Sequence, residues 1–240
     1  MLASAWESLS ELVLVAGHAV LRQAGAPDLL DEAAWVLQPF QRGEVPYFVE
    51  HVRAGVEQAR INPAALLVFS GGQTRPEAGP ISEAGSCFAV AQRFAWWGAH
   101  GVRLRATTEE FARDSFENLL FGICRFRECC GALPSRVVVV GWEFKRRRFE
   151  LHRAALGLPP DRFRYVGAND PPRHDDALRG ELVHGIEPFE RDPMGARCPL
   201  ADKRRMRNPS RRHHGYLQSC PELRELLVSS EPLPPDRLPW

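Results

Sequence analysis

The feature that most restricts the fold of this 240-residue chain is a run of four consecutive valines, at positions 137–140. β-Branched side chains favour an extended strand, and a strand that is apolar on both faces must be buried on both faces. Such strands occur in parallel sheets that carry helices on both sides. The run therefore predicts an α/β protein.

Similar short runs alternate with amphipathic segments along the chain. We expect strands at residues 11–16, 65–69, 102–105, 136–140 and 162–166. Apolar residues at helical spacing predict helices at 46–61, 82–97, 114–130 and 144–156, with one more short helix around 183–186. The alternation predicts a Rossmann-like three-layer α/β/α fold over roughly residues 9–190, with a mainly parallel sheet of about five strands.

Two stretches depart from this alternation. Residues 18–45 form a connection too long for a minimal unit, and residues 29–37 are expected to supply a helix within it. After residue 190 the chain becomes basic and rich in Pro. A short helix is expected at 221–228 and an extended tail at 229–240. We therefore divide the chain into a domain of residues 1–190 and an extension of residues 191–240.

Charge and hydropathy exclude several classes of protein. The chain has 31 Lys and Arg against 30 Asp and Glu, a formal net charge of +1, which argues against a globally basic nucleic-acid-binding protein. No apolar run approaches the roughly 18–20 residues of a membrane span, and Glu7 and Glu11 fall where a signal peptide would be apolar. We expect a cytoplasmic protein without a membrane partner.

The six cysteines are expected to be free thiols in a reducing compartment, because a chain of this size needs no disulfide framework and has no CxxC pair. The spacing of Cys124, Cys129 and Cys130 matches no common zinc motif, so we assign no metal ligands. No motif in the sequence indicates a particular cofactor.

Candidate site residues follow from one rule of open α/β sheets, in which ligands bind beyond the carboxyl ends of the strands. The rule selects residues that follow or end four expected strands. These candidates are Gly17, His18, Ser70, Gly71, Gly72, Glu109 and Lys145.

The segment FSGGQT is the first of these candidates. Two glycines allow unusual backbone angles, and the N–H groups of Gly71 and Gly72 are expected to hold an anion beside the Ser70 hydroxyl. The alternative is a tight turn between strand and helix without a ligand.

Polar residues at two expected helix starts have the same two interpretations. Glu83 complements the helix dipole, or it faces the crevice as a functional carboxylate. Ser115 is either a helix cap or a ligand-binding hydroxyl. Asn118 lies beside apolar residues and must be hydrogen-bonded if it is buried. Together with Glu109, Glu83 and Asn118 are our candidates for catalytic residues.

Residues 145–148, KRRR, form a basic helix start, where cations oppose the helix dipole. Lys145 and Arg148 are expected to clamp an anionic group. The alternative is a solvated basic face paired with Glu143 and Glu150. His152 shares a helix face with Arg148 and is more typical of a structural histidine.

The combined motifs resemble those of the YdcF/SanA-like family. That family shows an SGG turn, a downstream SEA, a Glu before a Ser/Thr-x-Glu-Asn helix start, and a strand followed by His-x-x-Arg. The corresponding residues here are Ser70, Gly71, Gly72, Ser82, Glu83, Ala84, Glu109, Ser115, Glu117, Asn118 and Arg148. Lys145 stands where bacterial members have His, as in the eukaryotic, fungal-type branch, which the segment KRRMRNP at 203–209 also resembles.

The resemblance covers roughly residues 10–228 and implies a Rossmann-like fold with a polar pocket at the strand ends. It also implies that the basic extension packs on the domain and that the protein is cytoplasmic, but it implies no particular reaction. We expect a protein that binds a small anionic, nucleotide-like metabolite, and any catalysis to be a hydrolase or transferase reaction with a Glu as general base.

Two alternatives remain open from the sequence. One is a nucleic-acid or acidic-protein binder that uses residues 145–148 and 203–212. The near-zero net charge makes nucleic acid the less favoured partner. The other is a scaffold without chemistry that uses the Pro-rich tail for its contacts.

Overall fold

Five parallel strands form one central sheet in a computed structural model that describes residues 6–23 and 25–240. The strand order is β5-β4-β1-β6-β7. The strands are β1 (Glu11–Ala16), β4 (Ala65–Ser70), β5 (Ala106–Glu109), β6 (Arg136–Trp142) and β7 (Phe163–Asn169). A separate antiparallel pair joins β2 (Val20–Leu21) to β3 (Trp35–Val36).

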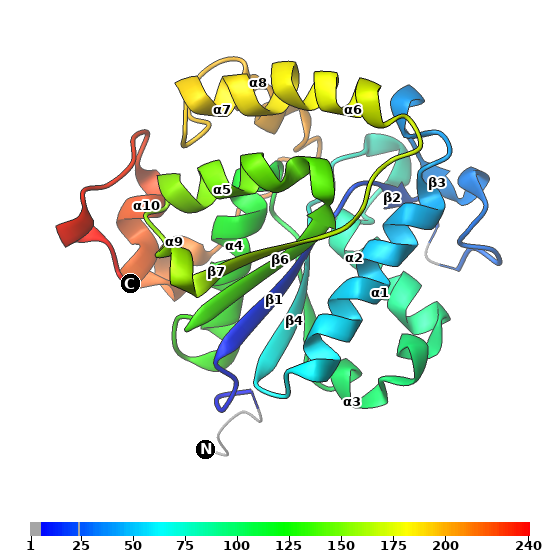
Figure 1. Cartoon of the computed structure of the whole chain (residues 1–240), viewed down its shortest axis with the longest axis horizontal. Coiled ribbons are helices and arrows are strands. Elements are labelled where there is room, and N and C mark those ends of the chain that lie inside the picture. The colour runs from blue at the N-terminus through cyan, green and yellow to red at the C-terminus, as the bar shows by residue number, and fades with distance from the viewer. Residues whose placement is uncertain (1–5, 24) are drawn as a thin grey trace.

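Helices cover both faces of the sheet, so the fold has three layers (Figure 1). On β1, Leu12 and Leu14 pack with α4 and α5, while Val13 and Val15 pack with α1 and α2. The helices are α1 (Val45–Ile61), α2 (Glu83–Arg93), α3 (His100–Arg103), α4 (Ser115–Cys130), α5 (Arg146–Ala155), α6 (His174–Glu181), α7 (Glu187–Arg191), α8 (Leu200–Met206), α9 (Tyr216–Ser219) and α10 (Arg224–Val228). The predicted three-layer α/β/α class is confirmed.

The strand order reverses at β1. The chain runs outward from β1 to β4 and β5 on one side, and then places β6 and β7 on the other side. Leu14 of β1 consequently lies opposite Val68 of β4 and Val139 of β6. In open α/β sheets this reversal creates a crevice at the carboxyl ends of the central strands, where ligands bind.

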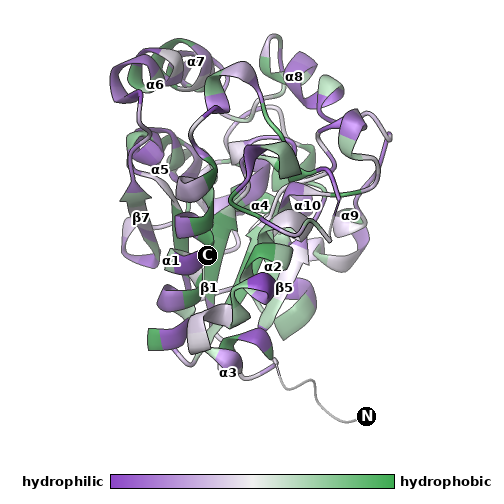
Figure 2. Ribbon diagram, turned by 90° about the vertical axis from the view of Figure 1, so that its right-hand side faces the viewer, coloured by the Kyte–Doolittle hydropathy of each residue, from purple (hydrophilic) through white to green (hydrophobic). Residues whose placement is uncertain are grey.

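A cap formed by residues 174–206, from α6 through α8, lies beyond those carboxyl ends. Its helices lie together at the top of Figure 1 and Figure 2. Figure 2 shows the central strands in hydrophobic colours and the cap mostly in hydrophilic ones. A turn of π-helix, Leu182–Ile186, joins α6 to α7. The cap therefore supplies mainly polar side chains to whatever lies beneath it.

The extension after residue 190 packs on the same core as α4. Tyr216, Cys220 and Leu223 are buried in that core. Residues 229–240 were expected to form an extended tail, but Leu238 packs against this core, and the Trp240 indole N–H donates to the Leu156 carbonyl at 3.0 Å. Large apolar side chains within the Pro-rich segment explain why it is held against the domain.

Three expected elements differ in the structure. The strand expected at 102–105 begins later, at Ala106, because Val102 belongs to α3 and Leu104 is exposed. The helix expected at 29–37 is instead a turn, Glu32–Ala34, that leads into β3. The helix expected at 82–97 ends at Arg93 and continues as a separate turn, Ala95–Gly98.

None of the helices among residues 6–23 and 25–240 is long and apolar enough to cross a membrane. The cysteines at 87, 124, 129, 130, 198 and 220 all carry free thiols.

Candidate functional site

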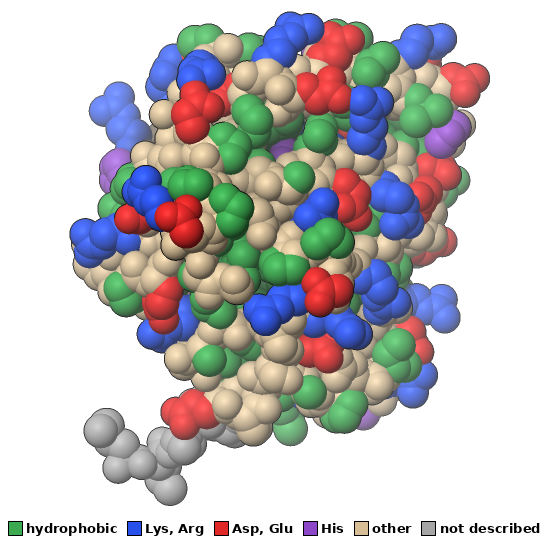
Figure 3. Space-filling view, turned by 60° about the vertical axis from the view of Figure 1, so that its left-hand side comes forward, with side chains coloured by type: hydrophobic (Ala, Val, Ile, Leu, Met, Phe, Trp, Pro, Cys, Tyr) green, Lys and Arg blue, Asp and Glu red, His purple; other side chains and the backbone are tan. Residues whose placement is uncertain are grey.

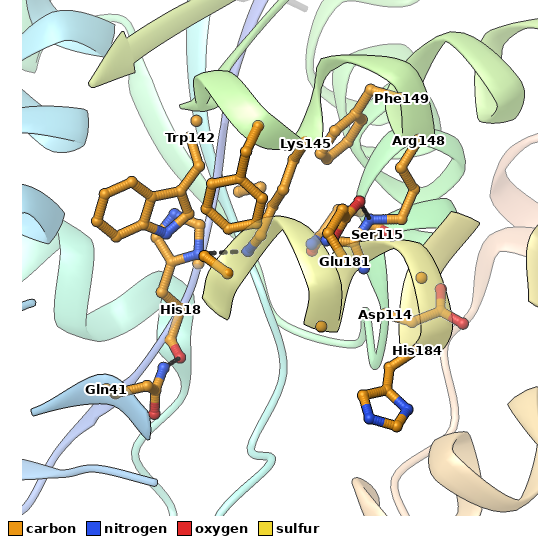
Figure 4. A pocket seen from close by; sticks show the side chains of 18 of the residues that line it. His18, Gln41, Asp114, Ser115, Trp142, Lys145, Arg148, Phe149, Glu181 and His184 are labelled. Atoms are coloured by element: carbon orange, nitrogen blue, oxygen red, sulfur yellow. Dashed lines mark hydrogen bonds and ion pairs between the residues drawn. The ribbon is translucent and has the colours of Figure 1, made fainter. Parts of the chain in front are cut away.

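A cavity of about 630 Å³ lies at the carboxyl ends of β1 and β6, beneath α6. Its volume falls in the range of small-molecule sites. Figure 4 shows His18, Gln41 and Trp142 together at one end, and Asp114, Arg148 and His184 toward the other. The cavity therefore has an aromatic, histidine-containing end and an ionic end.

Seven of the candidate site residues line this cavity, although they come from four separate segments of the chain. They are Gly17, His18, Glu83, Ser115, Asn118, Lys145 and Arg148. The other four candidates, Ser70, Gly71, Gly72 and Glu109, lie behind the wall and are not among the lining residues.

The N–H groups of the two adjacent glycines are already used within the backbone. Gly71 donates to the Glu109 carbonyl at 3.0 Å, and Gly72 donates to the Ala112 carbonyl at 2.7 Å. The expectation that these N–H groups hold an anion is therefore wrong. The alternative interpretation, a tight turn between strand and helix, describes this segment.

Gly71, together with Gly17, instead makes room for the side chain of Glu83. A Cβ atom on Gly17 would lie 2.6 Å from the Glu83 Cβ, and one on Gly71 would lie 2.7 Å from it. Ordinary side chains do not tolerate such contacts, so the absence of Cβ atoms lets the start of α2 approach the sheet. The Glu83 carboxylate lines the cavity and accepts a hydrogen bond from the Thr74 hydroxyl at 2.5 Å.

Glu109 is buried behind the cavity and joins four parts of the fold. Its carboxyl group accepts hydrogen bonds from the Ser70 hydroxyl at 2.7 Å, the Phe111 N–H at 2.7 Å, the Ala112 N–H at 3.3 Å and the Tyr216 hydroxyl at 3.2 Å. Burial raises the pKa of Glu109 to about 7. Because Glu109 does not reach the cavity, its expected role in orienting a ligand is corrected to a structural one.

Ser115 begins α4, with its hydroxyl oxygen 2.7 Å from His152 Nε2. The helix cap is Asp114, whose carboxylate accepts the Glu117 N–H at 2.9 Å and the Arg204 Nε–H at 2.6 Å. Ser115 is thus free of the capping role. His152 is fully buried, and burial followed by Arg148 lowers its pKa to about 3, so it is neutral at physiological pH.

Most of the basic helix start at 145–148 is neutralised by glutamates. Arg146 pairs with Glu143 at 2.6 Å, Arg147 pairs with Glu190 at 2.5 Å, and Arg148 pairs with Glu181 at 2.9 Å. The paired, solvated face is therefore correct for Arg146 and Arg147, whose side chains point away from the cavity lining. Glu150 pairs with Arg153 instead.

Lys145 differs from the three arginines that follow it. No ion pair within 4.0 Å involves Lys145 in the part of the chain that the structure describes, and its Nζ lies 3.4 Å from His18 Nδ1. Burial, followed by Arg148, lowers the pKa of Lys145 to about 8. Lysine occurs only twice in the sequence, at 145 and 203, and both side chains line the cavity.

Cations outnumber anions around the cavity. The cationic lining residues are Arg75, Arg113, Lys145, Arg148, Arg173, Lys203 and Arg207. The acidic lining residues are Glu44, Glu83, Asp114, Asp176 and Glu181. Three of these acids are already paired, Asp114 with Arg204, Asp176 with Arg179 and Glu181 with Arg148. Of the cations, Arg113 and Arg148 are paired with glutamates. Five cations and two acids of the lining remain outside these pairs, so the potential favours an anion.

Sequence reasoning missed a buried histidine behind His18. His51 lies on α1, with Nδ1 2.8 Å from His18 Nε2 and Nε2 2.7 Å from Asn169 Oδ1. Burial lowers the pKa of His51 to about 3 and holds the pKa of His18 well below its ordinary value. The signal in the sequence was a single His on the apolar stripe of α1, which is also typical of a core residue.

Within residues 6–23 and 25–240, no group of three or more His, Cys, Asp or Glu side chains is arranged to hold a metal ion.

The chain is similar to an uncharacterized protein of Saccharomyces cerevisiae, YOR238W. The two are 26% identical over 265 residues, and the similarity covers 87% of each protein. No protein-family model matches the chain, and no solved structure matches it.

Proposed function

We propose that the cavity binds a small anionic metabolite of nucleotide-like shape. The observation that carries this proposal is the excess of cationic side chains, including both lysines of the chain, around a cavity of ligand size. Arginine and lysine side chains in a partly enclosed site bind phosphate and carboxylate groups through charge-assisted hydrogen bonds.

The two ends of the cavity fit the two parts of such a ligand. At one end, Phe144 and the exposed Phe40 offer aromatic surface for a planar group, and the buried Trp142 packs against Phe144. At the other end, Lys203 and Arg207 lie with Arg148 near the start of α4, whose N-terminal dipole also favours negative charge. A ligand with a planar ring and a phosphate group would engage both ends.

We further propose that any chemistry here is hydrolysis or group transfer, and that the chain belongs to the YdcF/SanA-like family. In support, Glu83, Ser115, Asn118 and Arg148, taken from separate motifs of the resemblance, surround one cavity. The free cysteines fit our proposal of a cytoplasmic location.

The pairing of the basic segments argues against the nucleic-acid alternative. Arg146, Arg147 and Arg205 each have a carboxylate partner, and Figure 3 shows Lys and Arg interspersed with Asp and Glu over the face it presents. Proteins that bind a phosphate backbone typically present a patch or stripe in which cations predominate.

Thermal unfolding in the presence of nucleotides, sugar phosphates and dicarboxylates tests the proposal. A ligand at 100 times its dissociation constant adds about 2.7 kcal/mol to the free energy of unfolding. In a chain of this size that raises the midpoint by roughly 5–10 °C. The matched variants are Lys145→Met, which removes an unpaired cavity cation, and Arg147→Met, which removes a neighbouring cation outside the cavity.

We expect the midpoint shift to be lost or reduced in Lys145→Met and kept in Arg147→Met. A panel without any shift, or a shift that both variants keep, would contradict the proposed site.

A further inference from the structure

A chain of hydrogen bonds runs from the surface to the cavity through four side chains and ends at a fifth, Lys145. Asn169 Nδ2 donates to Glu50 Oε2 at 2.6 Å, and Asn169 Oδ1 lies 2.7 Å from His51 Nε2. His51 Nδ1 lies 2.8 Å from His18 Nε2, and His18 Nδ1 lies 3.4 Å from Lys145 Nζ. The residues come from α1, the end of β7 and the loop after β1.

The carboxylate at the outer end determines the proton positions along this chain. An ionised Glu50 only accepts hydrogen bonds, so the amide of Asn169 must turn its NH₂ toward Glu50 and its oxygen toward His51. His51 Nε2 therefore carries a proton and donates it. Burial keeps His51 neutral, so its Nδ1 has a lone pair and accepts the N–H of His18 Nε2.

It follows that His18 Nδ1 also carries a lone pair. The His18 ring is held in place by Phe48 and Trp142, with ring centroids at 5.4 and 5.9 Å, and its carbonyl accepts the Gln41 amide at 2.7 Å. His18 is only partly buried and lines the cavity, whereas His51 is 1% exposed. The one nitrogen of this pair that can meet a ligand is thus an acceptor.

We propose that His18 is the general base of this site, accepting a proton at Nδ1 from a hydroxyl group or water held in the cavity, and that His51 and Asn169 are its positioning residues. This assignment rests on the proposed function, since it presumes a ligand in the cavity. It differs from the expectation of a Glu as the base, and from a purely ligand-binding role for His18.

The proton movements balance within the histidine pair. The O–H bond of the ligand or water breaks, its electron pair stays on oxygen, and the proton binds His18 Nδ1. The proton on His18 Nε2 can then pass to His51 Nδ1, which leaves the positive charge on His51 with its Nε2–H still donated to Asn169. This second transfer moves the positive charge away from Lys145 and toward Glu50.

An anionic ligand would make His18 a stronger base. The partial burial of His18 disfavours a positive charge on its ring, and Lys145, His51 and Arg148 also oppose its protonation. The acidic groups of the neighbouring walls are Glu44 before α1, Glu83 on α2, and Glu181 on α6, of which Glu181 is paired with Arg148. A bound anion adds negative charge beside Lys145 and Arg148, and so raises the proton affinity of His18.

The tautomers can be tested without any ligand. Long-range ¹H–¹⁵N correlation spectra of the labelled full chain distinguish protonated from lone-pair imidazole nitrogens. We expect a lone pair on Nδ1 and a proton on Nε2 for both His18 and His51, and a higher His18 pKa in Lys145→Met. A proton on His18 Nδ1 would overturn the proposal.

Chemical modification tests whether the lone pair is presented to the cavity. Diethylpyrocarbonate acylates accessible, unprotonated imidazole nitrogens, and peptide mapping identifies the site. We expect His18 to be modified and His51 to be protected, with slower modification of His18 when inorganic pyrophosphate occupies the cavity. A His18 that resists the reagent while the exposed His213 reacts would overturn the assignment of a base.

Two variants separate positioning from folding. Asn169→Leu removes the acceptor for His51 and should mix the tautomers of both histidines. The double variant Asn169→Asp/Glu50→Gln keeps an acceptor for His51 and a donor–acceptor pair at the outer end, so it should preserve the tautomers and raise the pKa of the pair. Equal spectra in all three proteins would show that Asn169 does not position His18. The ligand-free spectra do not depend on the anion, so a failed ligand panel and a wrong tautomer are distinguishable results.

Discussion

Replacement of Glu109 by Gln should abolish a pH dependence of stability that comes from one buried carboxyl group. Burial raises the pKa of Glu109 from an ordinary value of 4.5 to about 7. Between these values the folded chain keeps a proton that the unfolded chain has released. Raising the pH through this window therefore destabilises the folded state.

The size of the effect follows from the shift. Each pKa unit corresponds to about 1.36 kcal/mol, so Glu109 should lower the free energy of unfolding by about 3 kcal/mol between pH 4 and pH 8. Glutamine has the same shape and does not ionise. Its NH₂ group can donate to Ser70 Oγ, while the Ser70 hydroxyl turns to Asn118 Oδ1, which lies 2.9 Å away.

Urea denaturation of the natural chain and of Glu109→Gln at pH 4.5, 6 and 8 measures this contribution. The buried histidines titrate in both proteins, so their effect cancels in the difference between the two. The variant should gain about 3 kcal/mol relative to the natural chain over this range, or roughly 6–12 °C in midpoint. A difference that stays constant with pH would refute the inference that Glu109 is protonated in the folded state near neutral pH.

Three further predictions concern the lysines, the glycines and the end of the chain. An amine reagent should label Lys145 faster than Lys203 near pH 8. Burial lowers the pKa of both lysines, but only that of Lys145 by a large amount, to about 8, and equal rates by mass spectrometry would contradict this. Gly71→Ala should lower the free energy of unfolding in urea by about 1–3 kcal/mol, because the added Cβ would lie 2.7 Å from Glu83 Cβ and the φ of Gly71 is +150°. Gly79→Ala controls for backbone strain, because Gly79 also has a positive φ but its added Cβ would meet no atom within 4 Å. Removal of residues 229–240 should lower the midpoint of thermal unfolding, because Leu233, Leu238 and Trp240 leave the core, and an unchanged midpoint would show that these contacts contribute nothing.

The sheet could be predicted because apolar residues at successive positions of its central strands indicate burial on both faces. The strands predicted at 11–16, 65–69 and 136–140 each contain an unbroken apolar run, and the structure places them together within β1, β4 and β6. The edge strand β5 was misplaced because its sequence, ATTE, is mostly polar. The more apolar residues before it are Val102, which lies in α3, and Leu104, which is exposed. An edge strand needs less apolar character, so composition marks it weakly.

The candidate site was predicted in outline by the rule for strand ends. That rule selects positions along the chain but not which side of a turn faces the cavity, so it could not separate His18, which lines the cavity, from Glu109, which lies behind it. The role of His51 depends on its distance to His18, 33 residues earlier, and to Asn169, 118 residues later. No local pattern encodes contacts of that range.

The packing of the extension has a consequence for synthesis. Tyr216 donates its hydroxyl to Glu109, and Leu223 and Leu226 complete the apolar face that α4 and β1 share, yet these residues are translated after every strand of the sheet. During translation, a nascent chain that has formed all five strands still exposes this face to water. The chain therefore passes through a stage in which its sheet is formed but one apolar face is exposed to water. A chain whose translation ends near codon 190 would keep that face exposed and be prone to aggregation.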